Sequence, residues 1–102
     1  MQMPMTLETV LETLRAHESE LRAMGVVHTS VFGSIARGTA HDQSDVDIAI
    51  DLDETKKITA FDYARIRRVI NEFFDGRADV VIRAALKRLV TVQYEREAID
   101  VF

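Results

Sequence analysis

Two short motifs contain the residues of this chain that are best suited to chemistry. The dipeptide Gly33-Ser34 is followed, after ten intervening residues, by Asp45-Val46-Asp47. Glycine has no Cβ and lets the backbone approach a ligand closely, and a helix beginning at Ser34 would direct its hydroxyl and first N–H groups at an anion. Carboxylate oxygens are hard ligands of the kind that Mg²⁺ prefers. Together the motifs indicate a phosphate site beside a metal site, which points to nucleotide chemistry.

Strict alternation of side chains places both aspartates on one predicted strand. Over residues 45–52, apolar side chains alternate with the set Asp45, Asp47, Ala49 and Asp51. Side chains two apart on a strand share a face, so the Asp45 and Asp47 Cα atoms would be about 6.5–7 Å apart. Two carboxylates at that separation can converge on one or two divalent ions. The structural alternative is a solvated strand face.

Asp79 and Arg37 are candidates for completing such a site. Asp79 precedes the apolar run Val80-Val81-Ile82, which is typical of a strand that could pair beside the acidic one. A third carboxylate would place a metal beside an attacking hydroxyl, although an acid at this position is also a common turn former. Arg37 lies one helical turn after Ser34. It is either a bidentate phosphate donor or an ordinary arginine at a helix end.

Other ionisable residues give weaker indications. Asp51 shares the face of Asp47 but lies too far along the strand to reach the same ion, so we expect a solvated strand end. His17 is expected to face solvent from a helix. We expect the other two histidines, His28 and His41, to be structural or exposed. Three basic residues flank the site in sequence: Lys56, Lys57 and Arg77. Any of them could contact a triphosphate, and the sequence does not rank them. Two basic clusters suit either solvated helix faces or the docking of an acidic partner: Arg65, Arg67 and Arg68, and Arg83, Lys87 and Arg88.

Strands interleaved with helices predict an α/β fold, here a small mixed β-sheet packed by helices. The first helix is expected to run from Leu7, capped by Thr6, through Leu21 to a stop at Gly25. The other expected elements are a strand over 26–32, a short helix over 34–37, a strand over 45–52, a helix over 58–74, a strand over 79–82, a mainly helical stretch over 83–97 and an edge strand over 99–102. The apolar stripe of the long helix is expected to include Phe61, Ile66, Val69, Ile70 and Phe73.

Composition narrows the class of protein. The 102 residues are 47% hydrophobic, which fits a single globular domain over residues 1–102. A net charge of −4 argues against direct nucleic-acid binding through a basic surface. Six acidic residues fall between Asp42 and Glu54, and the rest of the chain carries +2, so the acidity is concentrated at the motif. The chain has no cysteine, no signal peptide and no membrane-spanning run, so we expect a cytoplasmic protein with no membrane partner.

The motif residues, taken together, resemble a known family. Phe32-Gly33-Ser34-Ile35-Ala36-Arg37-Gly38 followed by Ser44-Asp45-Val46-Asp47-Ile48 is similar to the signature of the minimal nucleotidyltransferases, the MNT family of the DNA polymerase β-like nucleotidyltransferase superfamily. The likeness extends to residues 77–81 and to the closing residues 98–102. Departures such as Ile35 remove no functional group. The resemblance implies the polymerase β-like nucleotidyltransferase fold.

The resemblance also implies roles for individual residues. Gly33 and Ser34 would hold the nucleotide phosphates, and Asp45 and Asp47 would bind two Mg²⁺ ions. Asp79 would complete the metal-binding and catalytic triad and help activate the acceptor hydroxyl. Arg37 matches the family's arginine position and is a candidate nucleotide-binding residue.

Family members of this size are commonly antitoxins paired with a HEPN-domain ribonuclease toxin. The resemblance therefore implies an adenylyltransferase that moves AMP from ATP to a tyrosine hydroxyl of that toxin. A chain too short to carry an acceptor-binding domain would receive its acceptor from a partner, which agrees with this expectation. Two alternatives stay open: a binding module that neutralises a toxin by occlusion, and a nucleotidyltransferase that acts on a small molecule.

Overall fold

A four-stranded mixed sheet organises the protein. The computed structural model describes residues 5–40, 45–86 and 88–102; His41, Asp42, Ser44 and Lys87 lie outside them, as does the side chain of Arg88. The strands are β1 (Val26–Phe32), β2 (Val46–Leu52), β3 (Ala78–Ile82) and β4 (Ile99–Asp100), in the order β3-β2-β1-β4. β1 runs antiparallel to β2 and β4, whereas β2 and β3 are parallel. The predicted α/β class with a small mixed sheet is confirmed.

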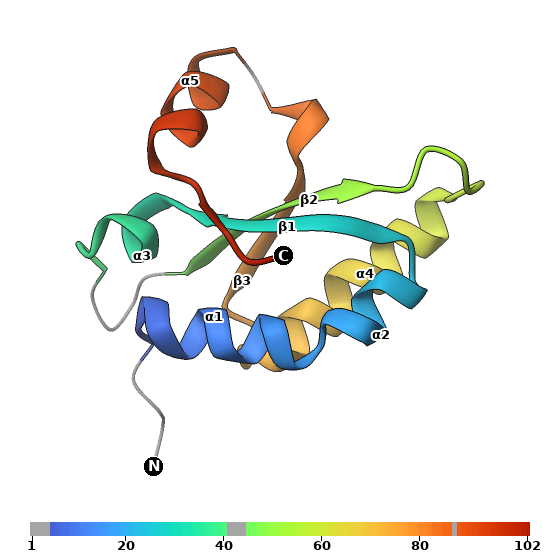
Figure 1. Ribbon diagram of the computed structural model, residues 1–102, viewed down its shortest axis with the longest axis horizontal. Helices are drawn as coiled ribbons and strands as arrows, with labels where there is room; N and C mark the ends of the chain where they lie inside the picture. Colours follow the sequence, from blue (N-terminus) through green and yellow to red (C-terminus); the bar gives the residue numbers. More distant parts are fainter. Residues whose placement is uncertain (1–4, 41–44, 87) are drawn as a thin grey trace.

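Helices cover both faces of this sheet (Figure 1). The helical elements are α1 (Leu7–Ala16), α2 (Glu18–Ala23), α3 (Gly33–Arg37), α4 (Ala60–Phe73), α5 (Arg88–Glu97) and the 3₁₀ turn η1 (Arg83–Ala85). α1, α2 and α4 pack on one face, and α5 lies on the other, as Figure 1 shows. Parallel strands need a crossover connection, and α4 supplies the one between β2 and β3.

The pleat of the strands separates an apolar face from a polar one. Val31, Ile48 and Val80 point into the core beneath α1 and α4, where Leu14 and Ile66 are fully buried. Successive side chains of a strand alternate between faces, so the polar residues of β2 all emerge on the face that α5 partly covers. The alternation predicted for residues 45–52 is therefore the geometric basis of the site.

The predicted single N-terminal helix is interrupted at His17. The Thr6 cap is confirmed, because its side chain accepts a hydrogen bond from the Thr9 amide. His17 leaves helical geometry (φ −108°, ψ 14°) and separates α1 from α2. Its ring stacks on Phe73, with centroids 3.9 Å apart, and its Nδ1 lies 2.8 Å from the Thr13 carbonyl oxygen. The expectation of a solvent-facing His17 was wrong, because the imidazole fills a half-buried position between α1 and α4.

α4 begins two residues later than predicted. Thr59 caps it in a capping box with Asp62, and the Thr59 amide and hydroxyl hydrogen bonds lower the pKa of the Asp62 carboxyl. Ile66 and Ile70 are fully buried, as expected. Phe61, however, is 88% exposed, so its place in the predicted apolar stripe was wrong. Phe61 lies in the first turn of α4, on its outward side.

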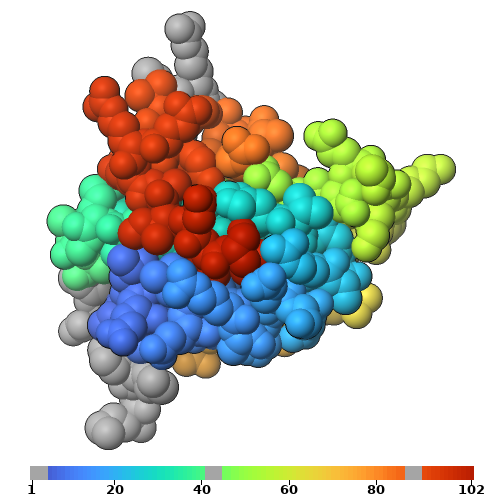
Figure 2. Space-filling view, viewed as in Figure 1, coloured from blue at the N-terminus to red at the C-terminus, as the bar shows by residue number. Residues whose placement is uncertain are grey.

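The C-terminal segment is less regular than predicted. Residues 83–97 form η1 and then α5, with extended backbone at Leu86 between them. β4 is only two residues long and pairs with β1 at the free edge of the sheet. The last residues lie in the surface between α1 and β1 (Figure 2), where the Arg15 side chain bonds the Val101 carbonyl and Arg22 covers the Phe102 ring. Within the described residues, no helix has the length and apolar character needed to cross a membrane.

Candidate active site

Parallel pairing of β2 with β3 brings two of the predicted acids together. Asp47 and Asp79 are register partners on adjacent strands, so their side chains leave the sheet on the same face. Asp45 immediately precedes β2, two residues before Asp47, and is exposed. The Val46 amide donates a 2.8 Å hydrogen bond to the Arg77 carbonyl, which holds the start of β2 against the start of β3. All three acids therefore lie at one end of the β2–β3 pair.

Gly33 forms the opposite wall of this acidic site. Its backbone has φ +74°, a left-handed conformation that side chains rarely adopt. A Cβ at this position would lie 3.0 Å from Asp47 Cγ and would collide with Oδ2. Only glycine lets the turn between β1 and α3 approach the Asp47 carboxylate so closely. Gly33 allows the close backbone approach that its residue type predicts, and here the close neighbour is a carboxylate of the protein itself.

A small hollow of about 290 Å³ opens beside these residues. It is lined by Phe32, Gly33, Ser34, Arg37, Asp47 and Gln93. α3 starts at its edge, so Ser34 stands in the first turn, where backbone N–H groups have no partner within the helix. The predicted phosphate-binding residues and one predicted metal ligand thus share one cavity.

The surroundings of Asp47 disfavour its negative charge. Burial is the main cause of the raised pKa of this carboxyl, and the nearby charges of Asp79 and Asp45 raise it further. Arg37 opposes the shift, and Glu97 adds to it. A half-buried carboxylate among other carboxylates is stabilised by a cation placed between them.

The donor chemistry of the three acids suits a divalent cation. Carboxylate oxygens at adjacent strand positions are typical Mg²⁺ ligands. Burial and the neighbouring carboxylates raise the pKa of Asp47, so a bound cation would stabilise its charged form. Within the described parts of the chain, no three acidic or imidazole groups are already arranged as ligands of one ion. Asp45 and Asp79 are both exposed, one on each side of the half-buried Asp47 in sequence or register.

Arg37 takes a position that neither sequence interpretation foresaw. Its Nη1 donates to both carboxylate oxygens of Glu97, at 3.0 and 2.9 Å, and so joins α3 to α5. Arg37 nevertheless lines the hollow together with Asp47. Glu97 and Gln93, which come from α5, are site residues that the sequence does not predict. Their four-residue spacing puts them on one face of that helix, but no feature of the sequence links this face to Arg37.

Asp51 lies at the other end of the same sheet face and is not a freely solvated strand end. Arg83 Nε donates to both of its oxygens, at 2.9 and 3.0 Å, and His28 Nδ1 lies 3.2 Å from its Oδ2. His28 Nε2 in turn lies 2.9 Å from Asp100 Oδ1. This cluster ties β1, β2, β4 and η1 together. His28 is therefore structural, as expected, while the expectation for Asp51 was wrong.

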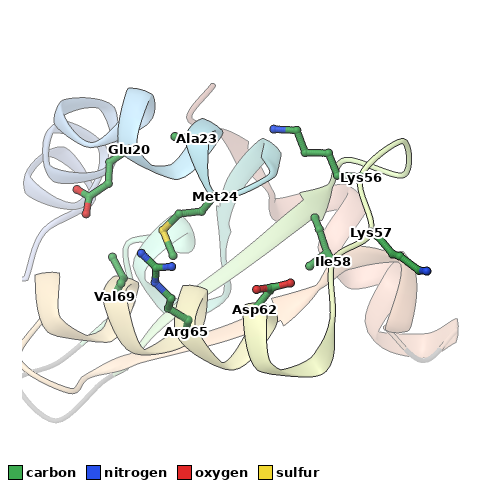
Figure 3. Close-up of a pocket in the computed structure, with 9 residues that line it drawn as sticks. All are labelled: Glu20, Ala23, Met24, Lys56, Lys57, Ile58, Asp62, Arg65 and Val69. Carbon is green, nitrogen blue, oxygen red and sulfur yellow. The ribbon is translucent and has the colours of Figure 1, made fainter.

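The lysines that follow β2 do not flank the site in space. Lys56 and Lys57 line a separate hollow of about 450 Å³ between α2, α4 and the loop after β2 (Figure 3). That hollow also contains Glu20, Asp62 and Arg65, so its charge is mixed. It lies at the far end of β2 from Asp45 and Asp47. Arg77, by contrast, directly precedes β3 at the acidic end.

Comparison with known proteins agrees with this geometry. Residues 11–101 match the nucleotidyltransferase domain family. The chain belongs to this family. A curated relative from Thermococcus cleftensis, the protein adenylyltransferase MntA, is 35% identical over 98 residues, which cover 95% of this chain and 97% of the relative. The recognition of a minimal nucleotidyltransferase from the sequence is confirmed, and the chain is an enzyme of the nucleotidyltransferase class.

Solved structures support the same fold. A chain assigned as a minimal nucleotidyltransferase superimposes with a TM-score of 0.77 and 34% identity, covering 96% of this chain and 98% of the solved one. An MNT antitoxin complex with tri-AMPylated HEPN toxin from Shewanella oneidensis gives a TM-score of 0.62, covering 90% of this chain and 71% of the solved one. At 14% identity, that second likeness concerns the fold alone.

Proposed function

We propose that this chain is a Mg²⁺-dependent protein adenylyltransferase that acts as the antitoxin of a HEPN-domain toxin. It would transfer AMP from ATP to a tyrosine hydroxyl of that partner and so silence it. The observation that carries the proposal is the register pairing of Asp47 with Asp79 beside the Gly33-Ser34 turn. The adenylyltransferase relative and the AMPylated toxin complex support the choice of AMP and of a protein acceptor.

Each site residue has a role in this proposal. Ser34 and the first N–H groups of α3 bind the phosphates, and Gly33 lets that turn approach Asp47. Asp45, Asp47 and Asp79 would hold two Mg²⁺ ions, which when bound would neutralise phosphate charge and lower the pKa of the acceptor hydroxyl. Arg37 lines the same hollow and donates to a phosphate oxygen.

The transfer itself is a single in-line displacement. The tyrosine oxygen bonds to the α-phosphorus of ATP, the bond from that phosphorus to the bridging oxygen breaks, and pyrophosphate leaves with the bond electrons. Asp79 would accept the proton of the hydroxyl, and its exposed position on β3 beside Asp47 supports this role. Positioning and charge stabilisation supply most of the catalysis in reactions of this type.

The decisive test combines modification with neutralisation. The protein is incubated with labelled ATP, Mg²⁺ and the HEPN protein encoded beside it, and mass spectrometry locates AMP on the partner. Asp45→Asn/Asp47→Asn should abolish both labelling and toxin silencing. Asp53→Asn/Glu54→Gln removes the same charge at the far end of β2 and should leave both intact.

Two outcomes would contradict the proposal. Full silencing by the Asp45→Asn/Asp47→Asn variant without AMP on the toxin would show neutralisation by occlusion. AMP transfer to a small hydroxyl compound, with none to the HEPN protein, would show a small-molecule nucleotidyltransferase instead.

A further inference from the structure

We propose that Glu97 is a positioning residue for the nucleotide site. It holds the Arg37 guanidinium at the phosphate hollow and keeps it from pairing with Asp47, a proposed metal ligand. This inference rests on the proposed function, because it concerns how the site receives its triphosphate. It assigns a role to α5, a helix that contains none of the signature residues.

The contacts of Glu97 fix the direction of Arg37. Both Glu97 oxygens accept from a single guanidinium nitrogen, Nη1, and Oε1 also lies 3.3 Å from Gln93 Nε2. The Glu97 side chain is only 17% exposed, whereas that of Arg37 is 40% exposed. The pair uses one of three guanidinium nitrogens, so the donors on Nε and Nη2 lie outside it. Those donors can serve a phosphate without breaking the ion pair.

α5 is itself anchored beside the hollow. The Tyr94 hydroxyl lies 2.5 Å from the buried Ser30 hydroxyl, and the Tyr94 ring packs edge-on against Phe32 with centroids 5.5 Å apart. Tyr94 is only 6% exposed. Glu97 follows Tyr94 by one helical turn and Gln93 directly precedes it, so both extend from a fixed point on the sheet.

The charges around Asp47 explain why such a residue is needed. Arg37 and Glu97 act on the Asp47 carboxyl in opposite directions, so each offsets part of the other's effect. Without Glu97, the long and flexible Arg37 side chain would be free to pair with Asp47, which lines the same hollow. Pairing there would occupy carboxylate oxygens that the metal needs. Glu97 thus supplies a cation donor to the phosphates while leaving the acids free.

ATP binding in the presence of Mg²⁺, measured by isothermal titration calorimetry, tests this inference without the toxin. We expect Glu97→Gln to weaken ATP binding about 5- to 20-fold, because one charge-assisted interaction is lost and Arg37 is misplaced. Glu95→Gln is the matched control, since it makes the same change at an exposed position of α5 and should leave binding unchanged. In an Arg37→Gln background, Glu97→Gln should add less than about a 2-fold effect, because Glu97 acts through Arg37.

The outcomes separate this inference from the proposed function. If Glu97→Gln binds ATP as the native chain does, or weakens binding equally with and without Arg37, the positioning role is overturned while AMP transfer by the native chain still stands. If the native chain binds no ATP, both are overturned. A role limited to helix packing would lower the unfolding temperature of Glu97→Gln and leave the ATP affinity of the folded protein unchanged.

Discussion

The backbone of Gly33 lies directly against the carboxylate of Asp47, with no space for a Cβ between them. This contact joins the Gly33-Ser34 turn to the acidic strand β2. The two motifs, separated by ten residues of sequence, therefore form one surface.

Replacing Gly33 tests that contact. We expect Gly33→Ala to destabilise the protein by about 2–4 kcal/mol, because it combines a left-handed backbone with a collision at Asp47. Gly38 has a similar φ of +76°, and a Cβ added there would meet nothing within 4 Å, so Gly38→Ala should cost only about 1 kcal/mol. Urea unfolding measures both. Equal losses would mean that backbone conformation alone requires glycine at position 33.

Asp47 should favour function at the expense of stability. The pKa of the Asp47 carboxyl is raised in the folded protein. At pH values between the ordinary pKa of 3.8 and this raised pKa, the folded state therefore binds more protons than the unfolded state. Stability from this group is therefore lost across that window as pH increases. We expect Asp47→Asn to unfold at a higher temperature than the native chain at pH 7, and AMP transfer to fall at least about 100-fold.

Calorimetric scans at several pH values check the sign of this effect. The stability gain of Asp47→Asn should shrink as pH is lowered through the raised pKa toward 3.8, because the carboxyl of the folded protein becomes protonated across that window. A variant that is less stable than the native chain at pH 7 would contradict the raised pKa.

Asp79 should matter more for transfer than for nucleotide binding. It lies at the exposed side of the acidic site, where an acceptor would approach. We expect Asp79→Asn to lower kcat about 100-fold or more while the Kd for ATP changes less than about 3-fold. Asp75→Asn is a suitable control, because Asp75 has φ 53° in an exposed turn and asparagine tolerates that conformation. Loss of ATP binding in step with kcat would instead make Asp79 mainly a nucleotide-site residue.

The Asp51 cluster should affect stability without affecting catalysis. Asp51→Asn weakens the interactions with Arg83 and His28. Because Arg83 is half-exposed and its ion pair is screened by water, we expect the free energy of unfolding to fall by only about 0.5–1 kcal/mol. AMP transfer at 25 °C should be unchanged, because the cluster lies at the far end of β2. Thermal unfolding measures the stability of Asp51→Asn, and a transfer assay on the same preparation measures its activity. A loss of AMP transfer larger than the loss of folded protein would connect this cluster to the site.

Local patterns explain why much of the fold was predictable. Alternation defined β2, a capping threonine defined the start of α1, and Gly38 ended α3 with a left-handed residue. The pairing of Asp79 beside Asp47 was also anticipated, because an apolar run preceded by an acid suited a neighbouring strand. The roles of the individual site residues stay predictions that the experiments above address.

Contacts between distant residues explain what was missed. The break at His17 has no glycine or proline to mark it, and the Phe73 ring that stacks on it is far along the chain. Phe61 is an exception, because its spacing of five and nine residues from the buried Ile66 and Ile70 already puts it on the outward side of α4. Arg37 meets Glu97 across 60 positions, a separation at which periodicity carries no information.

The parallel β2–β3 pair has a consequence for how the enzyme acquires activity. Asp47 and Asp79 become neighbours only after α4 has crossed the sheet and both strands have paired, so no local fragment holds the complete acidic site. Catalytic competence is therefore a property of the whole cooperative fold. In a denaturant titration, AMP transfer would disappear together with the global unfolding transition, and a chain synthesised only as far as α4 would be inactive until β3 is in place.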